Sequence, residues 1–166
     1  MFRNINDFIS AFGYESASTL KTLRNITNEA LLDRPHDNIR SIQRLVWHIT
    51  ITLGEMLGKA GLDIDCPDEH STPPNDISTI CQAYETAAKS VMEQVKTRWT
   101  DADLSTEVNM YGEQWTKGTV LTVLIKHEAH HRGQLTVLMR LNGLTVPGVY
   151  GPSKEEWAAW NMASPE

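Results

Sequence analysis

The sequence predicts an all-α fold, a four-helix bundle with a longer loop before the fourth helix and a short helix at the C-terminus. Two observations lead to this fold class. Apolar residues recur at helical spacing in four long segments, and no two segments show the alternating pattern of paired strands. Neither a repeat nor a linker-like change in composition divides the 166 residues, so we expect a single domain over residues 1–166.

The first two predicted helices are followed by residues that stop helices. Apolar residues recur at helical spacing over residues 5–31, and this helix is expected to end before Pro35, because proline cannot continue a helix. A second segment covers residues 42–57 and is expected to stop at Gly61, since glycine readily takes the left-handed conformation that ends a helix.

The third and fourth predicted helices carry signals of their own. The third covers residues 77–95 and follows Asp76, a typical N-cap residue. The fourth covers residues 120–141 and is followed by Gly143 as its terminating residue, with Pro147 just beyond. The apolar start of this segment is also β-prone, which leaves the exact beginning of the helix open.

The remaining stretches are predicted loops. Residues 66–75 are rich in prolines and separate the second helix from the third. Residues 100–117 form the longer loop before the fourth helix, and whether they contain a short extended piece stays open. Residues 154–160 are expected to form the short C-terminal helix, with Pro152 or Ser153 at its start.

Composition argues against several classes of function. The formal net charge is −6 and the basic residues are scattered, which argues against nucleic-acid binding. The longest apolar run, residues 120–125, is too short to cross a bilayer, and the N-terminus shows no signal peptide. We therefore expect a cytoplasmic protein without nucleic-acid or membrane partners. Cys66 and Cys81 form no Cys-x-x-Cys unit, and we expect small apolar or loop residues rather than a disulfide.

The most informative run lies in the fourth helix, where His127 and His131 are four residues apart. Such residues share one face of a helix, and both lie within about 20° of the centre of the apolar stripe. Burying an unpaired polar group costs about 1–3 kcal/mol, so two core imidazoles need partners. Neutral imidazole nitrogens are good ligands for Zn²⁺ or Ni²⁺, and the pattern therefore favours a divalent metal site over hydrogen-bonded core histidines.

A third ligand is needed, because catalytic sites usually combine three protein ligands with an open position. His36 and His70 lie in predicted loops beside or among prolines, where we expect them to be exposed. His48 lies inside the second helix, but about 120° from the centre of its apolar stripe. The residues alone leave its role open, since it depends on which flank of the second helix faces the fourth.

The residues 46–48, Val-Trp-His, together with the run 127–135, His-Glu-Ala-His-His-Arg-Gly-Gln-Leu, resemble the DinB family of four-helix-bundle metalloproteins. Residues 138–147 also look like the usual ending of that family. The resemblance covers nearly the whole chain in length and helix order.

This resemblance implies a metal site formed by His48, His127 and His131. Family members with assigned activities look like enzymes that use low-molecular-weight thiols, such as bacillithiol or mycothiol, on small-molecule substrates, and the resemblance also suggests a homodimer. A divalent metal, zinc or nickel, would then deprotonate a bound thiol for attack on an electrophile, or would activate water. The expected function is that of a metal-dependent, S-transferase-like enzyme or a hydrolase.

Three further residues beside these ligands are candidates for catalysis. Glu128 and His130 lie about 80° to either side of the apolar stripe, and Gln134 lies close to the stripe, one turn beyond His130. We expect Glu128 and His130 to support the ligands or to transfer protons, and Gln134 to donate a hydrogen bond into the pocket. Arg132 lies far from the stripe centre, where a surface or ion-pairing role is expected.

Two other interpretations of the motif remain. Residues 127–131 also match His-Glu-x-x-His, the zinc-peptidase pattern, in which Glu128 activates water and Glu155 or Glu156 would be the third ligand. The absence of a convincing strand to bind a peptide and the short stretch after the motif count against it. Alternatively, the metal is structural and joins the second helix to the fourth in a non-enzymatic, stress-related protein.

Overall fold

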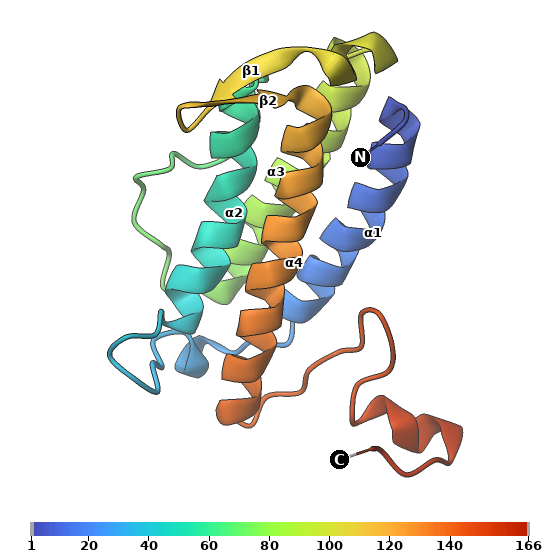
Figure 1. Ribbon diagram of the computed structural model, residues 1–166. Coiled ribbons are helices and arrows are strands. Elements are labelled where there is room, and N and C mark those ends of the chain that lie inside the picture. The colour runs from blue at the N-terminus through green and yellow to red at the C-terminus, as the bar shows by residue number, and fades with distance from the viewer. Residues whose placement is uncertain (1, 166) are drawn as a thin grey trace.

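Four long helices make up the body of the protein in the computed structural model, which describes residues 2–165 (Figure 1). In chain order the helices are α1 (Ile5–Leu23), α2 (Ile42–Lys59), α3 (Ile77–Arg98) and α4 (Lys117–Leu141). Both α1 and α2 pack mainly against α3 and α4. This arrangement confirms the predicted all-α four-helix bundle. No helix in the described part of the chain is long and apolar enough to span a bilayer.

The helix directions decide which faces meet. Helices α2 and α3 run in the same direction, and α1 and α4 run in the opposite one (Figure 1). The connection over residues 60–76 therefore returns along the outside of the bundle from the end of α2 to the start of α3. Because α2 and α4 are antiparallel neighbours, the first half of α2 lies beside the second half of α4.

The predicted helix ends are confirmed at several positions. Asp76 caps α3 by accepting a hydrogen bond from the backbone N–H of Thr79 at 3.0 Å. Gly61 and Gly143 follow α2 and α4 with φ angles of +89° and +68°, which a side chain would strain. The start of α4, left open by the sequence, is set by Thr116, which acts as its N-cap.

Helix α1 ends at Leu23, whereas the helical spacing predicts a continuous helix to residue 31. The side chain of Asn25 donates a hydrogen bond to the carbonyl oxygen of Lys21 at 2.9 Å, as asparagine often does where a helix breaks. A 3₁₀ helix, η1 (Asn28–Ala30), follows, and Leu31 beyond it is only 1% exposed. The apolar spacing therefore predicts the burial correctly but the helix length wrongly.

The longer loop before α4 contains structure that the sequence left open. A 3₁₀ helix, η2 (Asp101–Ser105), leads into an antiparallel hairpin of β1 (Glu107–Met110) and β2 (Glu113–Thr116). The two turn residues, Tyr111 and Gly112, have φ angles of +57° and +89°, as in the tight turns that join short hairpins. The expectation of no strand pair is therefore corrected, although the sheet remains a minor addition to the bundle.

The short C-terminal helix is present as the 3₁₀ helix η3 (Glu156–Trp160). It begins later than predicted, and the Glu156 carboxylate accepts hydrogen bonds from the backbone N–H groups of Gly148 and Ser153 at 3.0 and 3.1 Å. These bonds close the preceding loop into a compact turn beside the end of the bundle (Figure 1).

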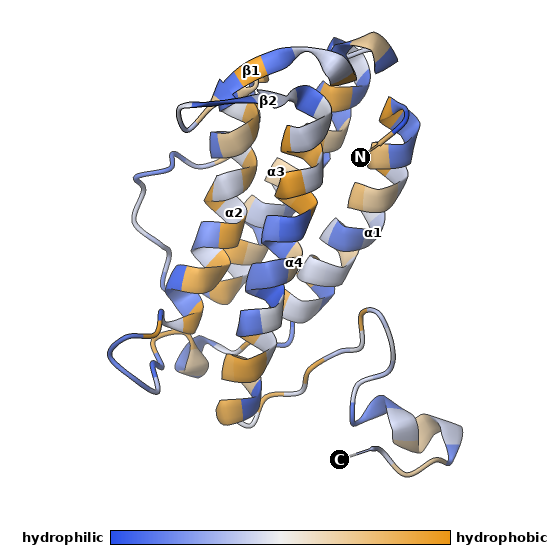
Figure 2. Ribbon diagram, in the orientation of Figure 1, coloured by the Kyte–Doolittle hydropathy of each residue, from blue (hydrophilic) through white to orange (hydrophobic). Residues whose placement is uncertain are grey.

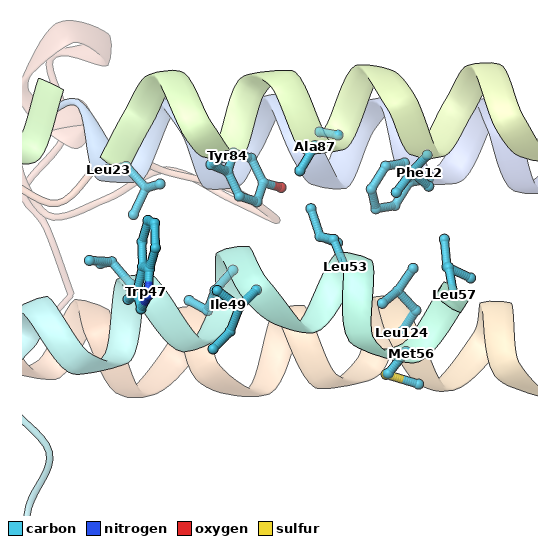
Figure 3. Close-up of a cluster of buried hydrophobic side chains, with 14 of the residues drawn as sticks. Phe12, Leu23, Trp47, Ile49, Leu53, Met56, Leu57, Tyr84, Ala87 and Leu124 are labelled. Atoms are coloured by element: carbon cyan, nitrogen blue, oxygen red, sulfur yellow. The ribbon is translucent and has the colours of Figure 1, made fainter. Parts of the chain in front are cut away.

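The hydrophobic core fills the space between the four helices. Phe12, Leu53, Leu57 and Leu124 come from three helices and point into it together with Tyr84, whose hydroxyl is the polar exception (Figure 3). The apolar face of α4 is interrupted, because hydrophilic residues occupy its middle turns (Figure 2). A helix that places polar side chains against a core needs partners for them, and this stretch contains the histidine run.

Candidate metal centre

Three histidines from two helices meet where α2 packs against α4. His48 lies on α2, and His127 and His131 lie one turn apart on α4. The Nε2 atoms of all three pairs are 3.1 Å apart, so they form a nearly equilateral triangle. The structure therefore resolves the position of His48, because the flank of α2 that carries it faces α4.

Hydrogen bonds alone do not satisfy this triangle. Each imidazole nitrogen either donates a proton or accepts one, whereas each Nε2 here has two nitrogen neighbours at 3.1 Å. A tetrahedral zinc ion with bonds of 2.0–2.1 Å would hold its nitrogen ligands about 3.3–3.4 Å apart. The donor set and its spacing thus fit a divalent metal ion, and the three side chains form a group able to hold one.

The electrostatics of the centre favour neutral imidazoles. Burial lowers the pKa of His48 to about 4, assisted by His131 and His127. Burial likewise lowers the pKa of His127 to about 4 and lowers that of His131. The positive charge of Arg40 contributes in the same direction to all three pKa values. At neutral pH the lone pairs needed for metal binding are therefore available.

Gln134 and His130 are arranged behind one of the ligands. The Nδ1–H of His131 donates to Gln134 Oε1 at 2.8 Å, and the Gln134 amide nitrogen donates to His130 Nε2 at 3.1 Å. His130 and Gln134 are both exposed. Gln134 therefore orients His131, whereas the sequence predicted that it would donate into the pocket.

Glu128 points in a different direction from the histidines. Its side chain is 2% exposed, and Oε1 accepts a hydrogen bond from the hydroxyl of Tyr84 on α3. Its other oxygen, Oε2, has no hydrogen-bond partner within residues 2–165. Burial raises the pKa of this carboxyl group, which favours its protonated form. The carboxylate that the zinc-peptidase pattern requires beside the metal is thus engaged in the bundle core.

Arg132 has the predicted ion-pairing role, but it is buried rather than on the surface. Its guanidinium group is 2.6 Å from the carboxylate of Glu15 on α1 and also donates to Thr19 at 2.9 Å. Tyr150, from the segment after α4, contacts both Arg132 and Glu15 at 2.7 Å. Glu15 and Tyr150 were not predicted as partners of Arg132, because they lie 135 residues apart and carry no local motif.

Two open clefts border the histidines. The first, about 560 Å³ in volume, reaches His131, and we call it the apolar cleft; its lining includes Ile39, Arg40, Leu45, Val137, Leu138 and Leu141. The second, about 460 Å³ in volume, reaches His48 and His127, and we call it the charged cleft; its lining includes Arg44, Glu55, Glu69, Tyr111, Met56 and Val123. The centre is therefore accessible to small molecules from two sides.

The other metal-binding residue types lie elsewhere. His36 and His70 are exposed, as predicted. Cys66 and Cys81 are free and half-buried, and burial raises the pKa of both thiols. Glu155 pairs with Arg140 on the surface and is not part of the histidine cluster.

A four-helix bundle whose neighbouring helices bring three imidazole nitrogens together defines a class of proteins able to hold one metal ion between helices. The family model of the DinB family matches residues 1–162 of this chain. The chain therefore belongs to the DinB family.

Relatives of known sequence or structure agree with this assignment. The Bacillus subtilis protein YrdA is 36% identical over 166 residues, which cover 100% of this chain and 99% of that protein. The crystal structure of a DinB-like protein from Bacillus cereus has a TM-score of 0.86 at 35% identity, covering 90% of this chain and 100% of that one. The DinB-like protein YjoA from Bacillus subtilis shares the fold, with a TM-score of 0.68 at 21% identity, covering 86% and 97%.

Proposed function

We propose that this protein is a divalent-metal-dependent enzyme that activates a low-molecular-weight thiol for transfer to a small electrophile, with water as the alternative nucleophile. The observation that carries the proposal is the triangle of Nε2 atoms at 3.1 Å, whose histidines border two clefts. Zinc and nickel both suit three imidazole ligands.

The metal would be held by His48, His127 and His131. A divalent ion there would lower the pKa of a coordinated thiol or water and so generate a nucleophile at neutral pH. Gln134 supports this arrangement by holding the Nδ1–H of His131, which leaves Nε2 free for the metal. The walls of the two clefts would hold the reacting molecules near these three nitrogens.

An open coordination position favours chemistry over a structural metal. Within residues 2–165 the cluster contains three histidines and no fourth His, Cys, Asp or Glu. Structural zinc sites normally have four protein ligands, whereas catalytic sites keep one position free. Moreover, α2 and α4 are already joined by an extensive apolar core, so the bundle has a source of stability besides the ion.

The geometry gives little support to peptide hydrolysis. That reaction needs the Glu128 carboxylate beside the reacting water, yet Tyr84 and the core surround it. The hairpin of β1 and β2 could pair with an extended peptide, but its short strands belong to the loop before α4. A structural metal in a non-enzymatic protein therefore remains the more serious alternative.

The decisive measurement is the metal content and coordination of the purified protein, by elemental analysis and X-ray absorption spectroscopy. We expect near-stoichiometric zinc or nickel, bound by about three imidazoles with at least one further non-protein ligand. Thiol-transfer reactions would then be screened with the loaded protein. A folded protein that takes up no metal after reconstitution would refute the proposal, and a fourth protein ligand would favour the structural role.

We further propose that the protein acts in the cytoplasm as a homodimer on a small-molecule substrate. The dimer and the location rest on the family resemblance, and the small-molecule substrate rests on the small volumes of the two clefts. Sedimentation velocity of the metal-loaded protein tests the dimer, and a monomer at micromolar concentration would refute it.

A further inference from the structure

The two clefts beside the histidines differ in the charged residues that line them. The apolar cleft is lined mainly by aliphatic side chains from α2, α4 and the loop before α2, and Asn38 and Gln134 also border it. Ile39, Val137 and Leu141 are 41%, 59% and 64% exposed, so this cleft has an apolar, open rim. Arg40 is the charged residue of its lining.

Arg40 differs from most arginines of this protein in its contacts. Arg34 pairs with Asp37 in the loop before α2, and Arg132 pairs with Glu15 in the core. Within the described residues, the side chains of Arg40 and Arg44 form neither an ion pair nor a hydrogen bond, and of these two only Arg40 lines the apolar cleft. An exposed guanidinium group beside an apolar wall can bind a carboxylate with two parallel hydrogen bonds.

The charged cleft also has apolar walls, to which Ile51, Met56 and Val123 contribute, but it contains more charged residues. Arg44 lies in it one turn after Arg40, but two carboxylates, Glu55 and Glu69, line the same cleft. Both carboxylates share one lysine, Lys59, at 2.6 and 3.9 Å. One positive charge offsets only part of the negative charge of two carboxylates. Because these carboxylates repel an anion, we expect an organic anion to enter the apolar cleft rather than the charged cleft.

We propose that the apolar cleft binds a small organic anion with an apolar body, its carboxylate-like group on Arg40 and its aliphatic or aromatic part against Leu45, Val137 and Leu138. This inference deepens the proposed function and rests on it, since the occupant would be the substrate that reacts beside His131. The cleft volume of about 560 Å³ lies within the range of about 300–1,000 Å³ that holds drug-sized ligands.

The residues that line the apolar cleft support this orientation of the occupant. His131 borders the cleft, and among the Lys, Arg, Asp and Glu residues only Arg40 belongs to the lining, so an occupant faces this positive charge. A bound metal ion would add positive charge at the same end. The rim formed by Val137 and Leu141 continues along the same face of α4 beyond His131 and supplies only apolar contact. A molecule with one anionic end and one apolar end therefore matches the Arg40 end and the apolar rim of the cleft.

The test uses the zinc-loaded protein and three probes, octanoate, its neutral analogue octanamide, and acetate, followed by ¹H–¹⁵N chemical-shift titration. We expect octanoate to bind about ten-fold more tightly than either other probe, with shifts in α4 around Val137 and Leu138. Acetate measures direct coordination of a carboxylate to zinc, and octanamide measures the apolar contact alone.

The matched variants are Arg40→Gln and Arg44→Gln, which remove neighbouring exposed arginines from different clefts. Arg40→Gln should weaken octanoate binding about five-fold and leave octanamide unchanged, whereas Arg44→Gln should change neither by more than about two-fold. Equal octanoate affinity in wild type and Arg40→Gln would overturn the inference. Absence of any octanoate binding would also overturn the inference if a second copy of the chain covers Val137 and Leu141. Sedimentation of a Leu141→Glu variant would reveal such a covered surface.

The same titrations are repeated on metal-free protein, and zinc affinity is measured for both variants. Neither arginine is a metal ligand, so both variants should bind zinc at least as tightly as wild type. A protein that binds zinc but does not distinguish octanoate from octanamide refutes this inference alone. A protein that binds no zinc refutes the proposed function, whatever the probes show.

Discussion

The Nδ1–H of His131 donates a hydrogen bond to Gln134 Oε1 across 2.8 Å, and this contact determines which nitrogen of His131 is free. Because Nδ1 carries the proton, the lone pair is on Nε2, the atom that faces His48 and His127. His130 completes the chain by accepting from the Gln134 amide at 3.1 Å. One ligand is therefore oriented before a metal ion binds.

Replacing Gln134 tests this orienting role. Gln134→Ala should weaken zinc binding by about 10- to 100-fold, as is usual when the partner of a metal-bound histidine is lost. The affinity is measured by competition with a chromophoric chelator. Gln134→Glu keeps an acceptor oxygen and should restore most of the affinity. If the alanine variant binds zinc as tightly as the wild type, Gln134 has no orienting role.

Removing the third ligand separates a functional centre from a structural one. His48→Ala should abolish stoichiometric zinc binding while the helical circular dichroism spectrum stays unchanged, because the bundle core does not include this imidazole. The exposed His70 offers a matched control, and His70→Ala should retain zinc. Loss of the helical fold together with the metal in His48→Ala would instead support a structural metal.

The buried pair of Arg132 and Glu15 is expected to matter for stability. Their side chains are 3% and 11% exposed, so Arg132→Met leaves a carboxylate in the core without its cation. Breaking such a pair typically costs about 3–5 kcal/mol of unfolding free energy, measured here by urea denaturation. Arg140→Met breaks the exposed pair with Glu155 and should cost much less. Similar midpoints for the two variants would contradict the proposed importance of the buried pair.

The N-cap of α3 should make stability depend on pH. Hydrogen bonds from Ser78, Thr79 and Asn28 hold the pKa of Asp76 well below its usual range. A carboxyl group with a lowered pKa in the folded state stabilises the fold above its ordinary pKa near 4, and this contribution is lost as the pH falls further.

Asp76→Asn tests this dependence, because asparagine also caps helices but does not ionise. The variant should have a lower melting temperature than the wild type at pH 7, and the difference should shrink as the pH approaches 2. Thermal denaturation of both proteins between pH 2 and 7 measures it. A difference that stays constant over this range would show that the charge of Asp76 does not contribute.

Much of the fold follows from local patterns in the sequence. The spacing of apolar residues predicts all four long helices, and Asp76, Gly61 and Gly143 mark helix ends because capping depends on the nearest few residues. The same spacing overestimates α1, since a 3₁₀ turn can bury Leu31 as well as a helix can. The hairpin of β1 and β2 is harder to predict, because its four-residue strands carry little periodic signal.

The sequence by itself places His127 and His131 on one face of a helix, because that depends only on the period of the helix. Only the tertiary structure decides that His48 joins them, since the position of a residue 79 places earlier in the chain depends on how α2 packs against α4. Tertiary packing also turns Glu128 toward Tyr84 and buries Arg132 against Glu15. Local periodicity gives the direction of a side chain from its own helix, whereas the neighbouring helices determine what that side chain meets.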